Sequence, residues 1–133
     1  MDKEYLNLFI IIMANFNNAM SMITLAYSDN VAIRNLDMRV RCNDKEEFLQ
    51  CVDIIGEYNR FNREAVEKVL DVVKEYYSEG FGVVGYSIGR ENSPVIYLEI
   101  LDRSIFGIVK ELKTLGIADE VNIKGQNIRV WFD

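Results

Sequence analysis

The sequence predicts an α+β protein in which an antiparallel sheet packs against helices in a single pair of layers. Apolar residues recur every three or four positions in four segments, as in amphipathic helices. Five other segments have alternating or short apolar runs bounded by turn residues, as in strands. These segments follow the order α-β-α-α-β-β-α-β-β without a repeating β-α-β pattern, which favours a mostly antiparallel sheet. We expect residues 1–133 to form a single domain.

The first helix is expected over residues 3–28 and is unusually apolar. One face is apolar at alternating steps of three and four from Leu6 to Tyr27, and further apolar residues widen it. Such a helix is either buried within its own chain or partly buried by another chain. Because monomers rarely expose a large apolar patch, the second alternative predicts a homo-oligomer, in its simplest form a dimer. The residues expected to mediate self-association are Phe9, Ile11, Met13, Phe16 and Met20.

A strand and an acidic helical hairpin are expected next. Alternation over residues 36–42 predicts a half-buried strand. Asn43 is the expected N-cap of the second helix, with Glu46 as its capping-box partner, and Asn62 is the expected N-cap of the third. Residues 43–80 hold ten acidic against five basic residues. This charge indicates either a solvated face or a surface for a basic partner.

The C-terminal part is predicted to be rich in strands. The expected elements are strands over 81–89 and 94–101, a helix over 103–115 that is closed by Gly116, and strands over 121–124 and 127–132. Asp102 or Ser104 is expected to cap the helix. Gly125 fits the first central position of a two-residue type II′ turn between the last two strands.

Aromatic and charged residues are expected to share the outer face of this sheet. If Gly89 pairs with Pro94, then Tyr86 lies opposite Tyr97 on one face. Because Tyr, Trp and Arg are enriched at the centres of protein interfaces, this face is the candidate interaction site. The alternative is that the first helix covers it. The candidate interaction residues are Tyr86, Tyr97, Glu99, Arg129 and Trp131.

Catalytic, cofactor and metal sites are not indicated. The chain has no histidine, which removes the common Ser-His and Cys-His arrangements and the commonest transition-metal ligand. Residues 80–85 match G-x-G-x-x-G, but a helix precedes them and a strand follows, the reverse of a dinucleotide-binding unit. We expect these glycines to serve close packing only. Cys42 and Cys51 are expected to be buried, reduced thiols, which favours a cytoplasmic location.

Three functional hypotheses remain. The first is a non-enzymatic protein-interaction module that self-associates. The second is an acidic inhibitor or decoy whose helical hairpin binds a nucleic-acid-processing protein with a basic surface. The third is a small-molecule binder or carboxylate-dependent enzyme with a pocket near Glu99. A net charge of −6 disfavours direct nucleic-acid binding. The longest apolar run, residues 8–14, is too short to cross a membrane, so no membrane partner is expected.

Overall fold

A computed structural model describes residues 18–28, 37–77 and 82–133. It confirms the α+β class and the expected order of elements. The helices and strands, with their bounds, are α2 (Ala19–Ala26), β1 (Met38–Cys42), α4 (Lys45–Ile55), α5 (Arg63–Glu75), β2 (Gly85–Glu91), β3 (Ser93–Glu99), α6 (Ser104–Leu115), β4 (Glu120–Lys124) and β5 (Asn127–Trp131).

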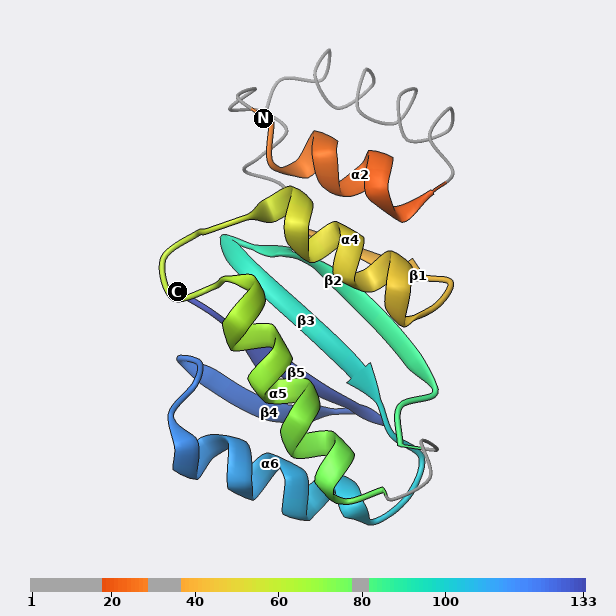
Figure 1. Ribbon diagram of the computed structural model, residues 1–133, viewed down its shortest axis with the longest axis vertical. Helices are drawn as coiled ribbons and strands as arrows, with labels where there is room; N and C mark the ends of the chain where they lie inside the picture. The colour runs from red at the N-terminus through yellow and green to blue at the C-terminus, as the bar shows by residue number, and fades with distance from the viewer. Residues whose placement is uncertain (1–17, 29–36, 78–81) are drawn as a thin grey trace.

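The strands form one antiparallel sheet in the order β1-β2-β3-β5-β4. Figure 1 shows α4, α5 and α6 in front of this sheet, so these three helices share one of its faces. The helix α2 contacts α4, β1 and β2, and therefore lies near the β1 edge. None of the described helices lies on the opposite face, which we call the open face.

Alternation along the strands separates the two faces as the sequence predicts for β1. Met38, Val40 and Cys42 are buried toward the helices, whereas Arg39 and Arg41 are exposed on the open face. Apolar residues from all five strands continue the helix-covered face and meet the apolar stripes of the helices. Removing this apolar area from water is the main source of stability for such a layer pair.

Side-chain caps define where three helices begin. Asn18 is the N-cap of α2, with an extended backbone and a hydrogen bond from the Ser21 amide at 2.8 Å. The prediction of one unbroken helix over residues 3–28 is therefore wrong at residue 18. Asn62 accepts a hydrogen bond from the Ala65 amide at 2.8 Å, which confirms the predicted N-cap of α5. The N-cap of α4 is Asp44 and not Asn43, because Asp44 accepts from the Glu47 amide at 2.8 Å. The capping partner is correspondingly Glu47, whose carboxylate accepts from the Asn43 amide. The predicted cap is therefore wrong by one residue.

The ends of α6 and the turn between β4 and β5 lie close to their predicted positions. Asp102 accepts from the Ser104 amide at 2.8 Å just before α6, although the residue at the N-cap position itself is Arg103. Gly116 ends α6 with φ of 63°. Gly125 has φ of 63° in the turn between β4 and β5, as the proposed type II′ turn requires at its first central position.

The hairpin of β2 and β3 has a different register from the expected one. Pro94 pairs with Arg90, and Gly89 pairs with Val95. The strands run up to Glu91 and Ser93, so Asn92, with φ of 66°, alone separates them. Side chains alternate between faces, and a shift of one residue along a strand therefore moves all of its side chains to the other face.

The two cysteines lie in the core. Cys42 ends β1, Cys51 belongs to α4, and both are buried free thiols, which confirms the predicted burial. A hydrogen bond with Cys51, together with burial, raises the pKa of the Cys42 thiol well above its ordinary value. Of the five residues expected to mediate self-association, Met20 is half-buried against the core. The others, Phe9, Ile11, Met13 and Phe16, lie outside the described residues.

Candidate functional site

The open face of the sheet brings together four of the five residues expected to form an interaction site. Tyr97 and Glu99 come from β3, and Arg129 and Trp131 come from β5. The pairing of Tyr97 with Arg129 and of Val95 with Trp131 places these side chains on one face. Tyr86 does not join them, which corrects the sequence prediction. It pairs with Leu98 on the helix-covered face and packs against Phe48 with ring centroids 5.3 Å apart.

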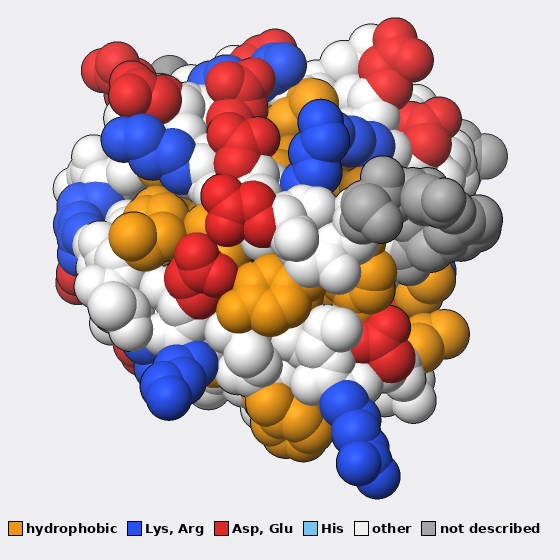
Figure 2. Space-filling view, turned by 60° about the horizontal axis from the view of Figure 1, so that its bottom comes forward, with side chains coloured by type: hydrophobic (Ala, Val, Ile, Leu, Met, Phe, Trp, Pro, Cys, Tyr) orange, Lys and Arg blue, Asp and Glu red, His pale blue; other side chains and the backbone are white. Residues whose placement is uncertain are grey.

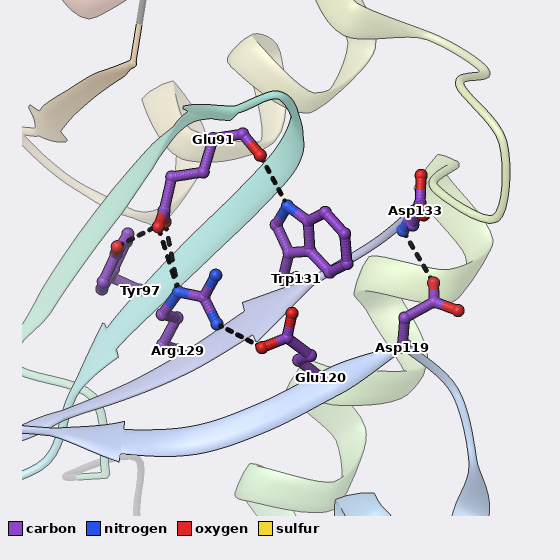
Figure 3. Close-up of polar contacts among 7 residues, drawn as sticks. All are labelled: Glu91, Tyr97, Asp119, Glu120, Arg129, Trp131 and Asp133. Atoms are coloured by element: carbon purple, nitrogen blue, oxygen red, sulfur yellow. Dashed lines mark hydrogen bonds and ion pairs between the residues drawn. The ribbon is translucent and has the colours of Figure 1, made fainter.

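Glu91 is the centre of a polar network on the open face (Figure 3). Its carboxylate accepts a hydrogen bond from the Tyr97 hydroxyl at 2.6 Å and from Arg129 Nε at 3.2 Å and 3.3 Å. The backbone carbonyl of Glu91 accepts from Trp131 Nε1 at 2.8 Å. Arg129 Nη1 also lies 3.5 Å from Glu120 Oε1 on β4. One glutamate thereby fixes three of the large side chains of this face.

The network shifts the pKa values of its members. Burial alone raises the pKa of Glu91, but hydrogen bonds from Tyr97 and Arg129 outweigh it and bring this pKa below its ordinary value. Burial, followed by the hydrogen bond to Glu91, raises the pKa of Tyr97. Burial lowers the pKa of Arg129, yet its bonds with Glu91 raise it overall. At neutral pH the network therefore contains an ionised Glu91, a neutral Tyr97 and a charged Arg129.

Two further arginines lie on the β1 side of this face. The Arg39 guanidinium carbon is 3.9 Å from the centroid of the Tyr97 ring, which is a cation–π stack. Arg41, whose side chain is 63% exposed, forms an ion pair with Glu99 at 3.4 Å. Arg39 has no ion pair with a described carboxylate. Within the described part of the chain, Arg39 is therefore a stacked cation without an ionic partner at the edge of this face.

The aromatic residues of the face are less accessible than the sequence suggests. Tyr97 is only 3% exposed and Val95 is fully buried, although no described helix covers them. Arg39 stacks on Tyr97, and Trp131 lies beside Val95 across the β3–β5 pair. Among the described residues, Arg39 therefore covers part of the Tyr97 ring.

Sequence reasoning missed Glu91 and Arg39 as members of this site. Between the strands expected over 81–89 and 94–101, Glu91 falls in a turn, where the sequence indicates no neighbours for its carboxylate. Arg39 was correctly placed opposite the core side of β1, but its neighbours depend on the pairing of β1 with β2 and of β2 with β3. The exposed position of Arg39 on a strand of alternating polarity was the available signal.

The glycine-rich motif packs closely, as expected. A Cβ atom at Gly85 would lie 2.7 Å from Arg41 Nη2 and 2.8 Å from Glu99 Oε1. A Cβ at Gly82 would meet the ring of Tyr77, which leaves no room for a side chain. Gly80 lies outside the described residues. The strand that follows Gly82 and Gly85 confirms that this motif does not open a helix.

The acidic surface of the helical hairpin is partly neutralised. Arg63 at the start of α5 bonds both Asp53 at 2.7 Å and Glu67 at 2.8 Å, and Lys68 lies 3.5 Å from Glu64. Figure 2 shows acidic side chains that follow one another from the top of the view toward its centre, with basic side chains on either side and apolar side chains in several separate places.

Neither a metal site nor a membrane span is found among the described residues. No group of three or more His, Cys, Asp or Glu side chains in residues 18–28, 37–77 and 82–133 is arranged to hold a metal ion. None of the helices in these same ranges has the length and apolar character needed to span a bilayer. Comparison of the chain with protein-family models, with curated proteins and with solved structures gives no match. Function must therefore be argued from the geometry of this chain alone.

Proposed function

We propose that the protein is a non-enzymatic interaction module that binds a protein partner through the open face of its sheet. The observation that carries this proposal is the open face itself, where the exposed Arg39 and the partly exposed Trp131 lie beside the largely buried Tyr97 and Arg129 without a described helix over them. Side chains of these types supply much of the binding energy at protein interfaces. Because Glu91 already holds three of them in place, little side-chain entropy is lost on binding.

Arg39 defines the chemistry of the partner. Its guanidinium has an aromatic support below it and no carboxylate partner among the described residues. A carboxylate from the partner would pair with this cation and become partly desolvated in doing so. We therefore propose that the partner presents an acidic side chain opposite β1 and an apolar surface opposite Trp131.

Site-specific photo-cross-linking tests the proposal. A benzophenone amino acid replaces Asn122, which is exposed on the open face of β4, or Glu64, which is exposed on α5. In cells that express the protein we expect cross-linked products from position 122 and few from position 64. Adding Arg39→Ala should weaken the products from position 122 at least fivefold, because arginines at interface centres are often energetic hot spots.

The control is Arg103→Ala, which removes an exposed arginine that precedes α6. It should leave the cross-links from position 122 unchanged. Equal cross-linking from positions 122 and 64, or cross-links from position 122 that are insensitive to Arg39→Ala, would overturn the proposal.

We further propose that one of the partners is a second copy of the chain. This part is supported by the apolar sequence of residues 6–16, and mass spectrometry of the same cross-linked products identifies self-association directly. The burial of Cys42 and Cys51 as free thiols supports a reducing, cytoplasmic location. Fractionation of the same cells checks the location.

A further inference from the structure

Arg90 occupies a position where arginine is unusual. It lies on the helix-covered face of β2, paired with Met38 of β1 and with Pro94 of β3. Only 7% of the residue is exposed. Arginine is rarely buried to this extent unless another group compensates its charge. The groups around the guanidinium therefore indicate how its charge is compensated.

The contacts that Arg90 makes with other described residues are all with neutral groups. Nη2 donates to the Tyr58 hydroxyl at 2.8 Å, and Nη1 reaches the carbonyl oxygen of Ala26 at the longer distance of 3.4 Å. The rings of Tyr27 and Tyr58 lie 4.9 Å and 5.2 Å from the guanidinium carbon. Nε is buried and has no acceptor among the described residues. Such contacts stabilise a cation without cancelling its charge.

No described carboxylate forms an ion pair with Arg90, and the negative groups beside the same cavity are two helix ends and the Asp133 side chain. Two helices end nearby, because Ala26 closes α2 and Ile55 closes α4 beside the same cavity. A helix C-terminus carries a partial negative charge of roughly half a unit, which offsets part of the guanidinium charge. The remaining charge suits a singly charged anion better than a doubly charged one.

Arg90 lines a cavity of about 560 Å³ between α2, α4 and the β2–β3 turn. Cavities of roughly 300–1,000 Å³ commonly accept small organic molecules. Most of the accessible lining of this cavity is polar, and Asn59 and Asn92 are among the residues that line it. Tyr27, Tyr58 and Ile54 line the cavity too and supply the smaller apolar part. Both asparagines have positive φ, 54° and 66°, which places them at the turns that border the cavity.

One acidic side chain also faces this space. Asp133 lines the cavity, where its Oδ1 accepts a hydrogen bond from the Ser93 hydroxyl at 3.3 Å. Its negative charge opposes the binding of any anion, and a doubly charged anion is opposed more strongly than a singly charged one. The affinity of the cavity should therefore increase when Asp133 is neutralised.

We propose that this cavity binds a small organic monocarboxylate on Arg90. A carboxylate offers two oxygens to adjacent N–H groups of one guanidinium, which is the strongest common arrangement for an arginine. The tyrosine rings and Ile54 then contact the carbon part of the ligand. Phosphate fits less well, since its second charge would face Asp133 and two helix C-termini. The site is separate from the open face and does not depend on the function proposed for that face.

Nuclear magnetic resonance of the ¹⁵N-labelled protein tests this site. Sodium benzoate is the carboxylate probe, sodium phosphate is the competing anion, and sodium chloride keeps the ionic strength equal. We expect benzoate to shift the Arg90 Nε–H resonance saturably, with a Kd below about 10 mM. Phosphate should bind at least tenfold more weakly. No saturation by about 50 mM benzoate, or tighter binding of phosphate, would overturn the proposal.

Three variants locate the binding. Arg90→Met should abolish it, and Arg103→Met, which removes an exposed arginine outside the cavity, should leave it unchanged. Asp133→Asn should tighten it roughly fivefold, because a like charge near the ligand is removed. Benzoate binding that persists in Arg90→Met contradicts the site. If Arg90→Met does not fold, Asp133→Asn decides, and an unchanged affinity in that variant contradicts the site equally.

Discussion

Arg129 and Arg90 are both largely buried arginines of the same sheet, but their charges have different neighbours. The Arg129 side chain, 12% exposed on the open face, bonds Glu91 and lies near Glu120. Arg90, on the helix-covered face, contacts two tyrosines and a helix end but no described carboxylate. The comparison separates two uses of one residue type. Arg129 holds a surface in a fixed shape, and Arg90 retains charge for a ligand.

Among the substitutions that test this comparison, Glu91→Ala should lower the free energy of unfolding most. The substitution leaves the Tyr97 hydroxyl and Arg129 Nε without their acceptor in a partly buried setting. Each unsatisfied group of this kind costs about 1–3 kcal/mol, so we expect the free energy of unfolding to fall by about 3 kcal/mol. Urea denaturation followed by circular dichroism measures the change.

Glu120→Ala is the matched control for Glu91→Ala. Glu120 also faces Arg129, but at 3.5 Å and with a side chain that is 53% exposed. Exposed ion pairs contribute about 0–1 kcal/mol, so this variant should lose less than 1 kcal/mol. Similar losses for both variants would show that Glu91 does not organise the open face.

The two hairpins show why one half of the open face could be predicted and the other could not. The turn at Gly125 has a strong signal in the sequence, and it fixes the register of β4 and β5. Arg129 and Trp131 consequently lie on the predicted face. The turn at Asn92 is shorter than the sequence predicts. The observed register of β2 and β3 is therefore shifted by one residue from the predicted register, in which Gly89 pairs with Pro94. Tyr86 therefore lies on the opposite face from the predicted one.

The same difference in register explains why the Arg90 cavity was not predicted. In the sequence, Arg90 belongs to a four-residue turn, where an arginine is ordinarily solvated. In the structure it is a strand residue on the core face, and its aromatic neighbours come from positions 27 and 58. Contacts between such distant positions depend on how α2 and α4 pack, which periodicity within one segment does not specify. Helix periodicity and the Asn62 cap, which are local, were predicted correctly for α5.

The pH dependence of stability gives a smaller effect that also distinguishes the two arginines. The pKa of Glu91 is below its ordinary value of 4.5 in the folded state. A carboxyl group with a depressed pKa stabilises the fold above its unfolded pKa and loses this contribution as pH falls through the folded pKa. We therefore expect the stability difference between the wild type and Glu91→Gln to shrink below about pH 4.5.

Urea denaturation at a series of pH values from neutral to acidic measures this difference. Arg90→Met provides the comparison, since no carboxylate is paired with Arg90 in the described part of the chain. Its stability difference from the wild type should change less over the same range than that of Glu91→Gln, because Asp133 lines the same cavity but forms no ion pair with Arg90. A Glu91→Gln difference that is constant with pH contradicts the assigned hydrogen bonds.

The smallest expected effect is that of Arg90→Met on the free energy of unfolding without ligand. A buried charge that lacks an ionic partner carries a desolvation cost, and an apolar side chain of similar size removes this cost. The lost bonds to Tyr58 and Ala26 act in the opposite direction by about 1 kcal/mol each. We expect these terms to cancel to within about 1 kcal/mol, whereas Arg129→Met should lose about 2 kcal/mol because it leaves Glu91 partly buried and unpaired. A loss above about 3 kcal/mol for Arg90→Met would mean that the fold requires this cation, and the contrast between the two arginines would disappear.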